Sequence, residues 1–367
     1  MQGAKTVTFP CTQCGSDLRF APGRDMLVCD HCGASNALPA PENVAEALSE
    51  RDFIKALQQS APAALTHDQR QVKCTSCGAE FSVAEDIHAT ECPFCASPVV
   101  TDTGQQRRIK PTALLPFALD EGAARAAMNN WLGTLWFAPN GLQEYARKGR
   151  AMQGIYAPYW TYDADTKSRY QGQRGTIYYV TETVMVEVNG RMQAQQQQVQ
   201  KIRWSPASGR VARFFDDILV LASTSLPKRY AEALGPWDLE ALTPYRADYL
   251  AGFTAEGYTV SLKDGYLEAR ELMDRVIDGD VRRDIGGDAQ RVDQVETKVT
   301  DITFKHVLLP IWLAAYKYRG QTYRFVVNGR SGAVQGERPW SWVKITLAAI
   351  GAIILAGIAA YFYAQNH

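Results

Sequence analysis

The longest uninterrupted apolar stretch of the chain is ITLAAIGAIILAGIAAYFY at residues 345–363, nineteen residues without a charge. A helix of this length is about 28 Å long, close to the ~30 Å hydrocarbon core of a bilayer. Tryptophans precede the stretch and tyrosines close it, an arrangement typical of side chains at the two membrane interfaces. The pattern predicts a transmembrane helix over 343–363, with a buried core helix as the alternative.

The residues beside this stretch predict its orientation. Arg338 and Lys344 lie on its N-terminal side, and only AQNH follows it. Positively charged flanks stay on the cytoplasmic side of a membrane. The opening sequence MQGAKTVTFP contains no apolar signal run. We therefore expect a single-pass tail anchor in the bacterial inner membrane, with the N-terminus and the main body in the cytoplasm.

Helical periodicity appears in three parts of the body. Residues 120–137 repeat apolar side chains at four-residue spacing behind Asp120, which can cap a helix. Residues 228–258 are predicted to be mostly helical, with interruptions at two prolines. Residues 262–281 form a further helical run, whose predicted core face consists of Leu267, Leu272, Val276 and Ile277.

Strand patterns lie between these helices. Residues 176–188 and 191–204 flank an Asn-Gly pair at 189–190, which predicts a β-hairpin over a type I′ turn. The Gly pair at 286–287 is typical of a turn from helix to strand, and residues 293–304 alternate as an exposed strand does. The body is thus predicted to be mixed α+β with antiparallel strands.

All eight cysteines lie near the N-terminus, in four C-x-x-C pairs: Cys11/Cys14, Cys29/Cys32, Cys74/Cys77 and Cys92/Cys95. Fourteen residues separate the inner cysteines of each half, and the two halves are displaced by 63 residues, which indicates an internal duplication. Two such knuckles present four thiolates to one ion, and a four-sulfur tetrahedron suits Zn2+. The spacing predicts two structural zinc sites, with iron as the alternative metal because thiolates alone do not fix its identity.

The residues around the cysteines predict how the two ribbons are arranged. Residues 41–59 are predicted to form a short amphipathic helix, and SAPAALTHDQRQ follows as a linker. We expect the ribbons to move as separate beads. Few basic residues lie between the knuckles, which favours contact with protein over nucleic acid.

Composition narrows the functional classes. The chain of 367 residues carries 39 basic and 39 acidic residues, so it lacks the basic excess typical of nucleic-acid-binding proteins. The overall composition does not exclude a local basic patch that binds nucleic acid. In the reducing cytosol, clustered cysteines indicate metal rather than disulfides.

Motifs of catalysis are absent from the sequence. It contains no G-x-x-x-x-G-K-[ST] phosphate loop, no G-x-S-x-G elbow and no H-E-x-x-H motif. Both four-cysteine sites are complete without an open position for water. Carboxylate pairs such as Asp216-Asp217 are interpreted as turn or strand-edge residues. We therefore predict a protein that is not an enzyme.

The predicted membrane helix carries small residues on one face. Such a stripe lets helix backbones approach closely in lipid, so it predicts packing on a partner helix or a second copy of this chain. The stripe consists of Ala348, Ala352, Ala356 and Ala360.

Several motifs together resemble a bacterial family. They are the knuckles CTQCG, CDHCG, CTSCG and CPFCA, and the stretches GIYAPYWTYDADT, DIGGDAQRV and TFKHVLLPIWLAAYKY. The chain resembles zinc-ribbon membrane proteins labelled TFIIB-type zinc ribbon, or primosomal protein N′/superfamily II helicase. The helicase label conflicts with the missing phosphate loop. The resemblance implies a role in membrane stress, in which the protein brings an SPFH-domain, flotillin-like partner to the membrane.

The sequence as a whole predicts an α+β protein in five parts. They are zinc ribbon 1 at 1–40, a helical linker at 41–70, zinc ribbon 2 at 71–103, an α+β cytosolic body at 107–338, and a transmembrane helix at 343–363. The predicted function is that of a membrane-anchored adaptor that recruits a partner protein. The alternative is a membrane-tethered nucleic-acid-binding protein.

Overall fold

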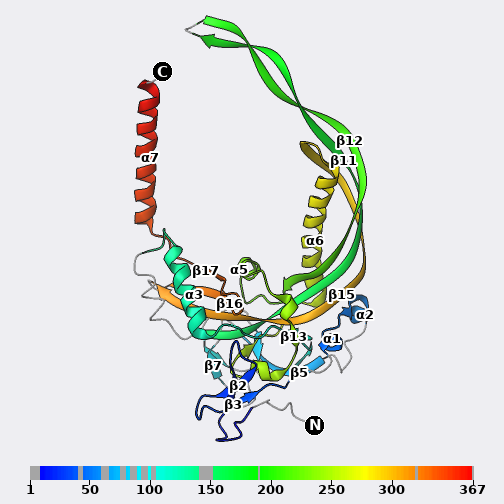
Figure 1. The fold of residues 1–367 in the computed structure, drawn as a ribbon, viewed down its shortest axis with the longest axis vertical. Coiled ribbons are helices and arrows are strands. Elements are labelled where there is room, and N and C mark those ends of the chain that lie inside the picture. The colour runs from blue at the N-terminus through cyan, green and yellow to red at the C-terminus, as the bar shows by residue number, and fades with distance from the viewer. Residues whose placement is uncertain are drawn as a thin grey trace.

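The computed structural model confirms a mixed α+β architecture with antiparallel sheets and one apolar C-terminal helix. A large curved sheet forms the body, the cysteine-rich strands lie at one end, and a long hairpin reaches the other (Figure 1). The C-terminal helix starts at the side of the sheet and extends in the same direction as this hairpin. The residues that the structure describes are 9–39, 44–58, 66–74, 80–82, 89–91, 98–100, 105–139, 152–188, 191–318 and 321–365.

The N-terminal third consists of short elements. Three small sheets have the strand orders β1-β2-β3, β6-β5-β9 and β7-β8. The segment predicted as a helical linker contains two short helices, but Thr66 already begins a strand. The elements are β1 (Leu18–Phe20), β2 (Met26–Cys29), β3 (Ser35–Ala37), α1 (Val44–Ala47), α2 (Phe53–Gln58), β5 (Thr66–Lys73), β6 (Glu80–Ser82), β7 (Ala89–Glu91), β8 (Pro98–Val100) and β9 (Gln105–Ile109).

The body is built on a nine-stranded sheet whose central path is β12-β11-β15-β10-β13. The long strand β11 pairs antiparallel with both β12 and β15, and among the described strands only β10 on β15 and β14 on β11 run parallel. The strands are β4 (Arg51–Asp52), β10 (Ala113–Leu114), β11 (Gln153–Val188), β12 (Arg191–Leu221), β13 (Thr243–Pro244), β14 (Thr254–Ala255), β15 (Ala289–Tyr318), β16 (Gln321–Asn328) and β17 (Val334–Gly336).

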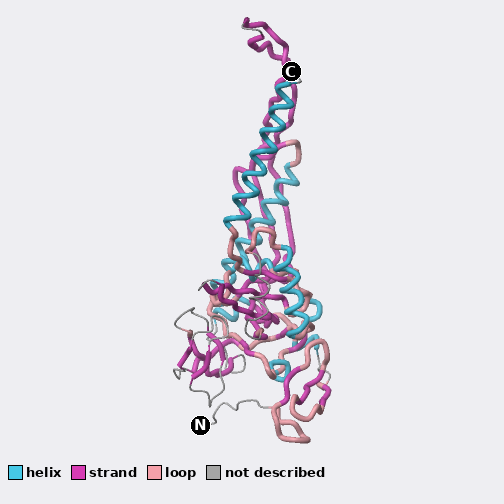
Figure 2. The backbone as a smooth tube through the Cα atoms, turned by 90° about the vertical axis from the view of Figure 1, so that its left-hand side faces the viewer, coloured by secondary structure: helices cyan, strands magenta, loops and turns pink. Residues whose placement is uncertain are grey.

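The predicted hairpin is confirmed, and it is much longer than the sequence indicated. Val188 pairs with Arg191, so two residues connect β11 and β12, and these two lie outside the described part of the chain. The pairing then continues in one register as far as Ala164 and Phe215, and beyond a β-bulge it extends to Tyr159 and Leu221. Strand β15 pairs with β11 between Gln153 and Gly175 and not beyond. The outer part of the hairpin, from residue 176 to the turn, is therefore a two-stranded arm (Figures 1 and 2).

Two predicted helices are confirmed, with one correction to the core face. Helix α3 (Glu121–Thr134) is capped by the side chain of Asp120, which accepts a hydrogen bond from Ala123 N. Helix α6 (Leu262–Ile285) covers the concave side of the sheet (Figure 1), but Leu267 is 55% exposed and Val276 41% exposed. The buried face is Leu262, Gly265, Ala269, Met273, Ile277, Val281 and Ile285.

The phase of α6 is determined by aromatic side chains on β11. A Cβ atom at Gly265 would lie 2.7 Å from Trp160 Cδ1 and 2.6 Å from the Tyr162 hydroxyl. The Tyr162 hydroxyl also donates to Leu262 O at 2.7 Å. Close approach to the sheet therefore requires glycine on this face, and the larger Leu267 and Val276 face outward.

The prediction that residues 228–258 are mostly helical is wrong. The segment contains α5 (Lys228–Ala233) and two 3-10 turns, η2 (Leu239–Ala241) and η3 (Ala247–Leu250). Pro236 follows α5 and cannot donate a helical hydrogen bond. Pro244 lies in β13, where the chain pairs with β10. The helical spacing of apolar residues here reflects packing against the sheet rather than one continuous helix.

The C-terminal helix α7 (Trp342–Gln365) is long and apolar enough to cross a membrane, and none of its apolar window is buried. Its first turn is attached to the body. Ser341 N donates to Phe137 O at 2.8 Å, and Lys344 Nζ donates to Ala138 O at 2.8 Å. An exposed helix of this composition has no apolar partner within the described protein, which is the condition expected of a segment that lies in lipid.

Candidate metal centre

The first two knuckles bring four cysteines together at the N-terminal end of the molecule. The sulfur atoms of Cys11, Cys14, Cys29 and Cys32 all lie within 4.8 Å of one another. Strand β2 ends on Cys29, and a bridge from Pro10 to Asp17 closes the loop that carries the first pair. Local hairpin geometry therefore aims both knuckles at one point, as the spacing predicts.

The sulfur spacing fits a tetrahedral metal ion. The distance between the sulfurs of Cys11 and Cys32 is 3.6 Å, and that between Cys14 and Cys29 is 3.5 Å. Four sulfurs at about 2.3 Å from a zinc ion would lie about 3.8 Å apart. The four residues could therefore hold a zinc ion after a small expansion.

Backbone amides in the first knuckle favour the thiolate forms of Cys11 and Cys14. Gly15 and Gly33 adopt φ of 76° and 75°, and their N–H groups donate to the carbonyls of Cys11 and Cys29. The neighbouring N–H of Ser16 lowers the pKa of Cys14 to about 6, and those of Gln13 and Cys14 lower the pKa of Cys11. Thiolates are the form that binds metal.

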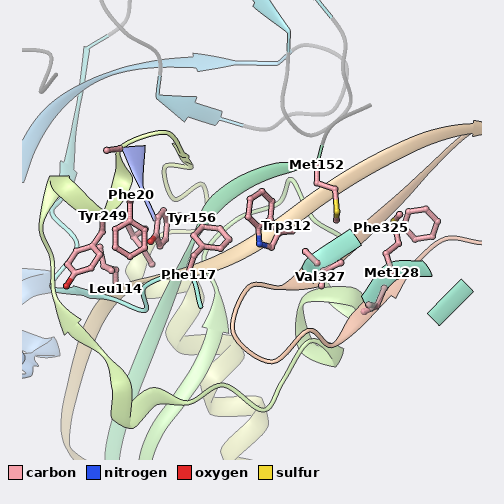
Figure 3. Close-up of a cluster of buried hydrophobic side chains, with 14 of the residues drawn as sticks. Phe20, Leu114, Phe117, Met128, Met152, Tyr156, Tyr249, Trp312, Phe325 and Val327 are labelled. Carbon is pink, nitrogen blue, oxygen red and sulfur yellow. The ribbon is translucent and has the colours of Figure 1, made fainter. Parts of the chain in front are cut away.

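The expectation that the ribbons move as separate beads is wrong for the first ribbon, which packs on the body. Cys11, Cys29 and Phe20 belong to the same buried cluster as Leu114 and Phe117 of the body. The rings of Phe20 and Tyr249 lie 5.1 Å apart (Figure 3). Phe20 N donates to Ala251 O at 3.0 Å, so backbone and side chains both tie the ribbon down.

Glycine is required where this contact is closest. Gly23 adopts φ of 71° and donates its N–H to Phe117 O at 2.9 Å. A Cβ atom there would lie 2.9 Å from Ala118 O. The four-cysteine ribbon is thus a fixed part of the folded body.

The second half of the cysteine-rich region repeats the strand register of the first. The pairs Pro10–Asp17 and Lys73–Glu80 are related by 63 residues, and so are Val28–Ser35 and Glu91–Pro98. Cys74 follows the first of the later pairs and is buried. Cys77, Cys92 and Cys95 lie outside the described residues.

Sequence reasoning missed a cluster of three carboxylates. Glu50, Asp163 and Asp217 each place an oxygen within 4.8 Å of the others. Lys305 Nζ lies 2.9 Å from Glu50 Oε1 and 3.0 Å from Asp217 Oδ1. Asp217 N donates to Asp163 Oδ1 at 2.7 Å, and the Thr303 hydroxyl donates to Glu50.

A β-bulge aims these side chains. Tyr162 pairs with Ile218 and Ala164 with Phe215, so two residues of β12 lie opposite Asp163. The second of them, Asp217, has a left-handed φ of 50°. The interpretation of Asp216-Asp217 as strand-edge residues holds for the backbone, because β12 is an outer strand of the described sheet. That interpretation misses the side chain of Asp217, which the bulge directs into the carboxylate cluster.

The ammonium group of Lys305 already lies between two of the carboxylates, so we interpret the cluster as an ion-pair network. Through Glu50 and Lys305, the network holds the segment before β4 against the central strand β15, with which β4 itself pairs. Phe53 extends this contact, because its ring lies 4.6 Å from that of Tyr266 and it belongs to the core beneath α6. The connection between the ribbons is therefore fastened to the sheet.

Asp163 should make stability depend on pH. Burial and the adjacent Glu50 raise the pKa of Asp163 to about 8, whereas an unfolded aspartate titrates near 3.9. The folded protein then binds a proton that the unfolded chain has released, so stability falls as pH rises from about 4 to 8. The slope from one proton is at most about 1.4 kcal/mol per pH unit. Thermal unfolding of detergent-solubilised protein across this range measures it.

The matched variant isolates that contribution. Asp163→Asn cannot ionise and keeps an oxygen for Asp217 N, so its unfolding temperature should lack this slope. Asp165→Asn, at an exposed position on the same strand, should retain it. An equal pH dependence in wild type and Asp163→Asn would show that Asp163 is ionised throughout. Glu50 has the opposite effect on the pH dependence of stability. Burial alone would raise its pKa, but hydrogen bonds from Asp163, Thr303 and Lys305 lower it to about 2, so the stability that Glu50 contributes is lost only in acid.

The chain has a distant sequence similarity to a known protein. The chain is 23% identical over 352 residues to the uncharacterized protein YdjG of Bacillus subtilis (strain 168), in an alignment that covers 92% of each chain. The similarity therefore extends beyond the cysteine-rich region into the body. No family model matches the chain, and no solved structure matches it.

Proposed function

We propose that this chain is a non-enzymatic adaptor, anchored in the bacterial inner membrane, that recruits a partner protein to the cytoplasmic face. The observation that carries the proposal is the placement of two features on one folded body. The four-cysteine ribbon lies at one end, and the apolar helix α7 starts at the side of the sheet and extends away from the ribbon, in the same direction as the β11–β12 hairpin (Figure 1). With α7 in lipid, the ribbon faces away from the membrane, where a cytoplasmic partner can reach it.

Two structural zinc sites are part of the proposal. Cys11, Cys14, Cys29 and Cys32 would hold the first ion, and Cys74, Cys77, Cys92 and Cys95 the second. The repeated strand register around the later knuckles supports the second site. A four-thiolate ion would cross-link the knuckles and leave no position for substrate. Iron is the competing metal.

Orientation and partner class rest on the residues beside α7 and on the family resemblance. Arg338 and Lys344 precede the apolar helix, which favours a cytoplasmic body. The resemblance supplies an SPFH-domain, flotillin-like protein as the partner and membrane stress as the process. Self-association through the alanine stripe of α7 stays a prediction.

Purification of the complex tests the proposal. The tagged full-length protein, extracted from its native cells in detergent after nuclease treatment, should carry a stoichiometric SPFH-domain or other membrane-stress protein. Replacing Cys74 and Cys77 by serine should release one zinc ion and the partner while the protein stays in the membrane fraction. If no protein co-purifies and an untreated sample carries DNA or RNA, the protein is a nucleic-acid-binding protein and the adaptor proposal fails.

A further inference from the structure

A cavity of about 480 Å³ lies beside the outer strand β12, between α5, the segment around Trp237 and α6. Its wall is mostly apolar and includes Tyr159, Leu221, Trp237 and Leu272. The volume lies within the range of binding sites for small ligands and side chains. Both helices lie on the side of the sheet from which α7 rises (Figure 1).

The backbone of β12 is available for pairing at this cavity. Ala222 N donates to Pro158 O at 2.9 Å, so Ala222 and Val220 direct their backbone groups toward β11. Because these directions alternate in an antiparallel ladder, Leu219 and Leu221 direct their N–H and C=O groups away from β11. No strand of the described chain pairs with that edge of β12. The N–H and C=O groups of both residues have no partner among the described residues.

One side chain in the wall has an unused hydrogen-bonding group. Tyr159 is only 3% exposed, and its hydroxyl has no hydrogen-bond partner in the described structure. Its ring packs against Trp237, with 6.2 Å between the ring centroids. A buried polar group without a partner is costly, and a ligand that supplied an acceptor would remove that cost.

The mouth of the cavity carries two cations and two carboxylates, Lys228 and Arg275 with Glu232 and Glu268. Lys228 is paired with Glu268 at 2.8 Å and with Glu232 at 4.0 Å, which joins α5 to α6. Arg275 also lines the cavity, and in the described part of the chain it has no ion-pair partner. The Arg275 guanidinium can therefore pair with a carboxylate that a ligand brings to the mouth.

We propose that an extended peptide segment of a partner protein adds as a strand to β12 at Leu219–Leu221. One apolar side chain of the segment occupies the cavity beside Trp237, and an acidic residue pairs with Arg275. The backbone groups of Leu219 and Leu221 select a peptide over an acyl chain, which offers them neither donors nor acceptors. The inference rests on the proposed adaptor function and identifies the chemistry of what the adaptor holds.

The test uses full-length protein in lipid nanodiscs and a phage-displayed library of random seven-residue peptides. A selected peptide is synthesised, labelled and titrated, and then N-methylated at each amide in turn. We expect methylation at the alternate amides that face β12 to weaken binding about tenfold or more, because each removes one backbone hydrogen bond. Methylation of the intervening amides should change affinity less than about threefold.

Protein variants locate the bound peptide. Trp237→Ala and Arg275→Glu should each weaken binding about tenfold or more. Their matched controls are Trp136→Ala, which removes a tryptophan that is 78% exposed away from the cavity, and Lys263→Glu, which reverses an exposed charge on the same helix. Arg275 is exposed, so its variant keeps the fold even if Trp237→Ala does not.

Several results would overturn the inference. They are a selection that yields no binding peptide, an affinity that neither variant lowers, and binding that ignores which amides are methylated. Displacement of the peptide by phosphatidylglycerol vesicles would instead assign the cavity to a lipid chain. If the two variants lose the peptide but still co-purify the cellular partner in full, this site is not the recruitment site and the adaptor proposal stands. If wild type co-purifies no protein, the adaptor proposal itself fails.

Discussion

Replacing Cys11 and Cys29 by serine should remove one metal ion per chain and release the first ribbon from the body. One thiolate is then lost from each knuckle, and a four-sulfur site cannot form. Structural zinc sites of this type contribute on the order of 10 kcal/mol to folding, because the ligands do not assemble in the unfolded chain. Cys11 and Cys29 are also buried against the body, so the packing of Phe20 should be lost as well.

Metal analysis and trypsin digestion of purified full-length protein measure both effects. Wild type should contain two zinc ions per chain, the double variant one, and the double variant alone should be cleaved rapidly after Arg19 and Arg24. His31→Ala is the control, because His31 lies in the second knuckle but outside the four-cysteine group. Unchanged metal content in the double variant would exclude the site, and iron in place of zinc would decide the identity of the metal.

The four-cysteine group could be predicted from the sequence because its geometry is local. A C-x-x-C pair fixes two sulfurs within one turn, and a short hairpin fixes the distance to the next pair. The long hairpin follows the same logic, since the two residues between Val188 and Arg191 set the register of the pairs as far as Ala164 and Phe215. Both features could be predicted because each is determined by residues that are close together in the sequence.

The ion-pair network of the three carboxylates and Lys305 could not be predicted, because its members come from four distant parts of the chain. Glu50 precedes β4, Asp163 and Asp217 lie on different long strands, and Lys305 lies on a third. A single bulge directs Asp217 inward. Pattern rules do not locate such a bulge, because it appears only when the register of two long strands is known.

The predicted core face of α6 was wrong for a related reason. A helical wheel places the largest apolar residues inward, but here Trp160 and Tyr162 of β11 fill the space between sheet and helix. The helix can approach them only through its small residues, Gly265 and Ala269. Which face of a helix is buried therefore depends on the size of the side chains opposite, and the sequence of the helix alone does not contain that information.

Replacing Ile353 and Ile354 by arginine should move the protein from the membrane to the soluble fraction. Both residues lie in the middle of α7 and are exposed. Each arginine at the centre of a transmembrane helix costs about 3 kcal/mol, so two should cost about 6 kcal/mol and make insertion unfavourable. Fractionation of cells that express the tagged full-length variants measures the distribution. The metal content should stay at the wild-type value, because α7 extends away from the ribbon (Figure 1).

The control keeps the helix apolar. Ile353→Leu with Ile354→Leu preserves hydrophobicity and helix propensity, so this variant should stay in the membrane fraction as wild type does. Carbonate washing separates insertion from adsorption, since an inserted helix resists extraction. If the arginine variant were retained after the wash, α7 would not be the anchor. In that case the exposed apolar surface of α7 would need a protein partner, and a cross-linkable residue at Leu355 would identify what covers it.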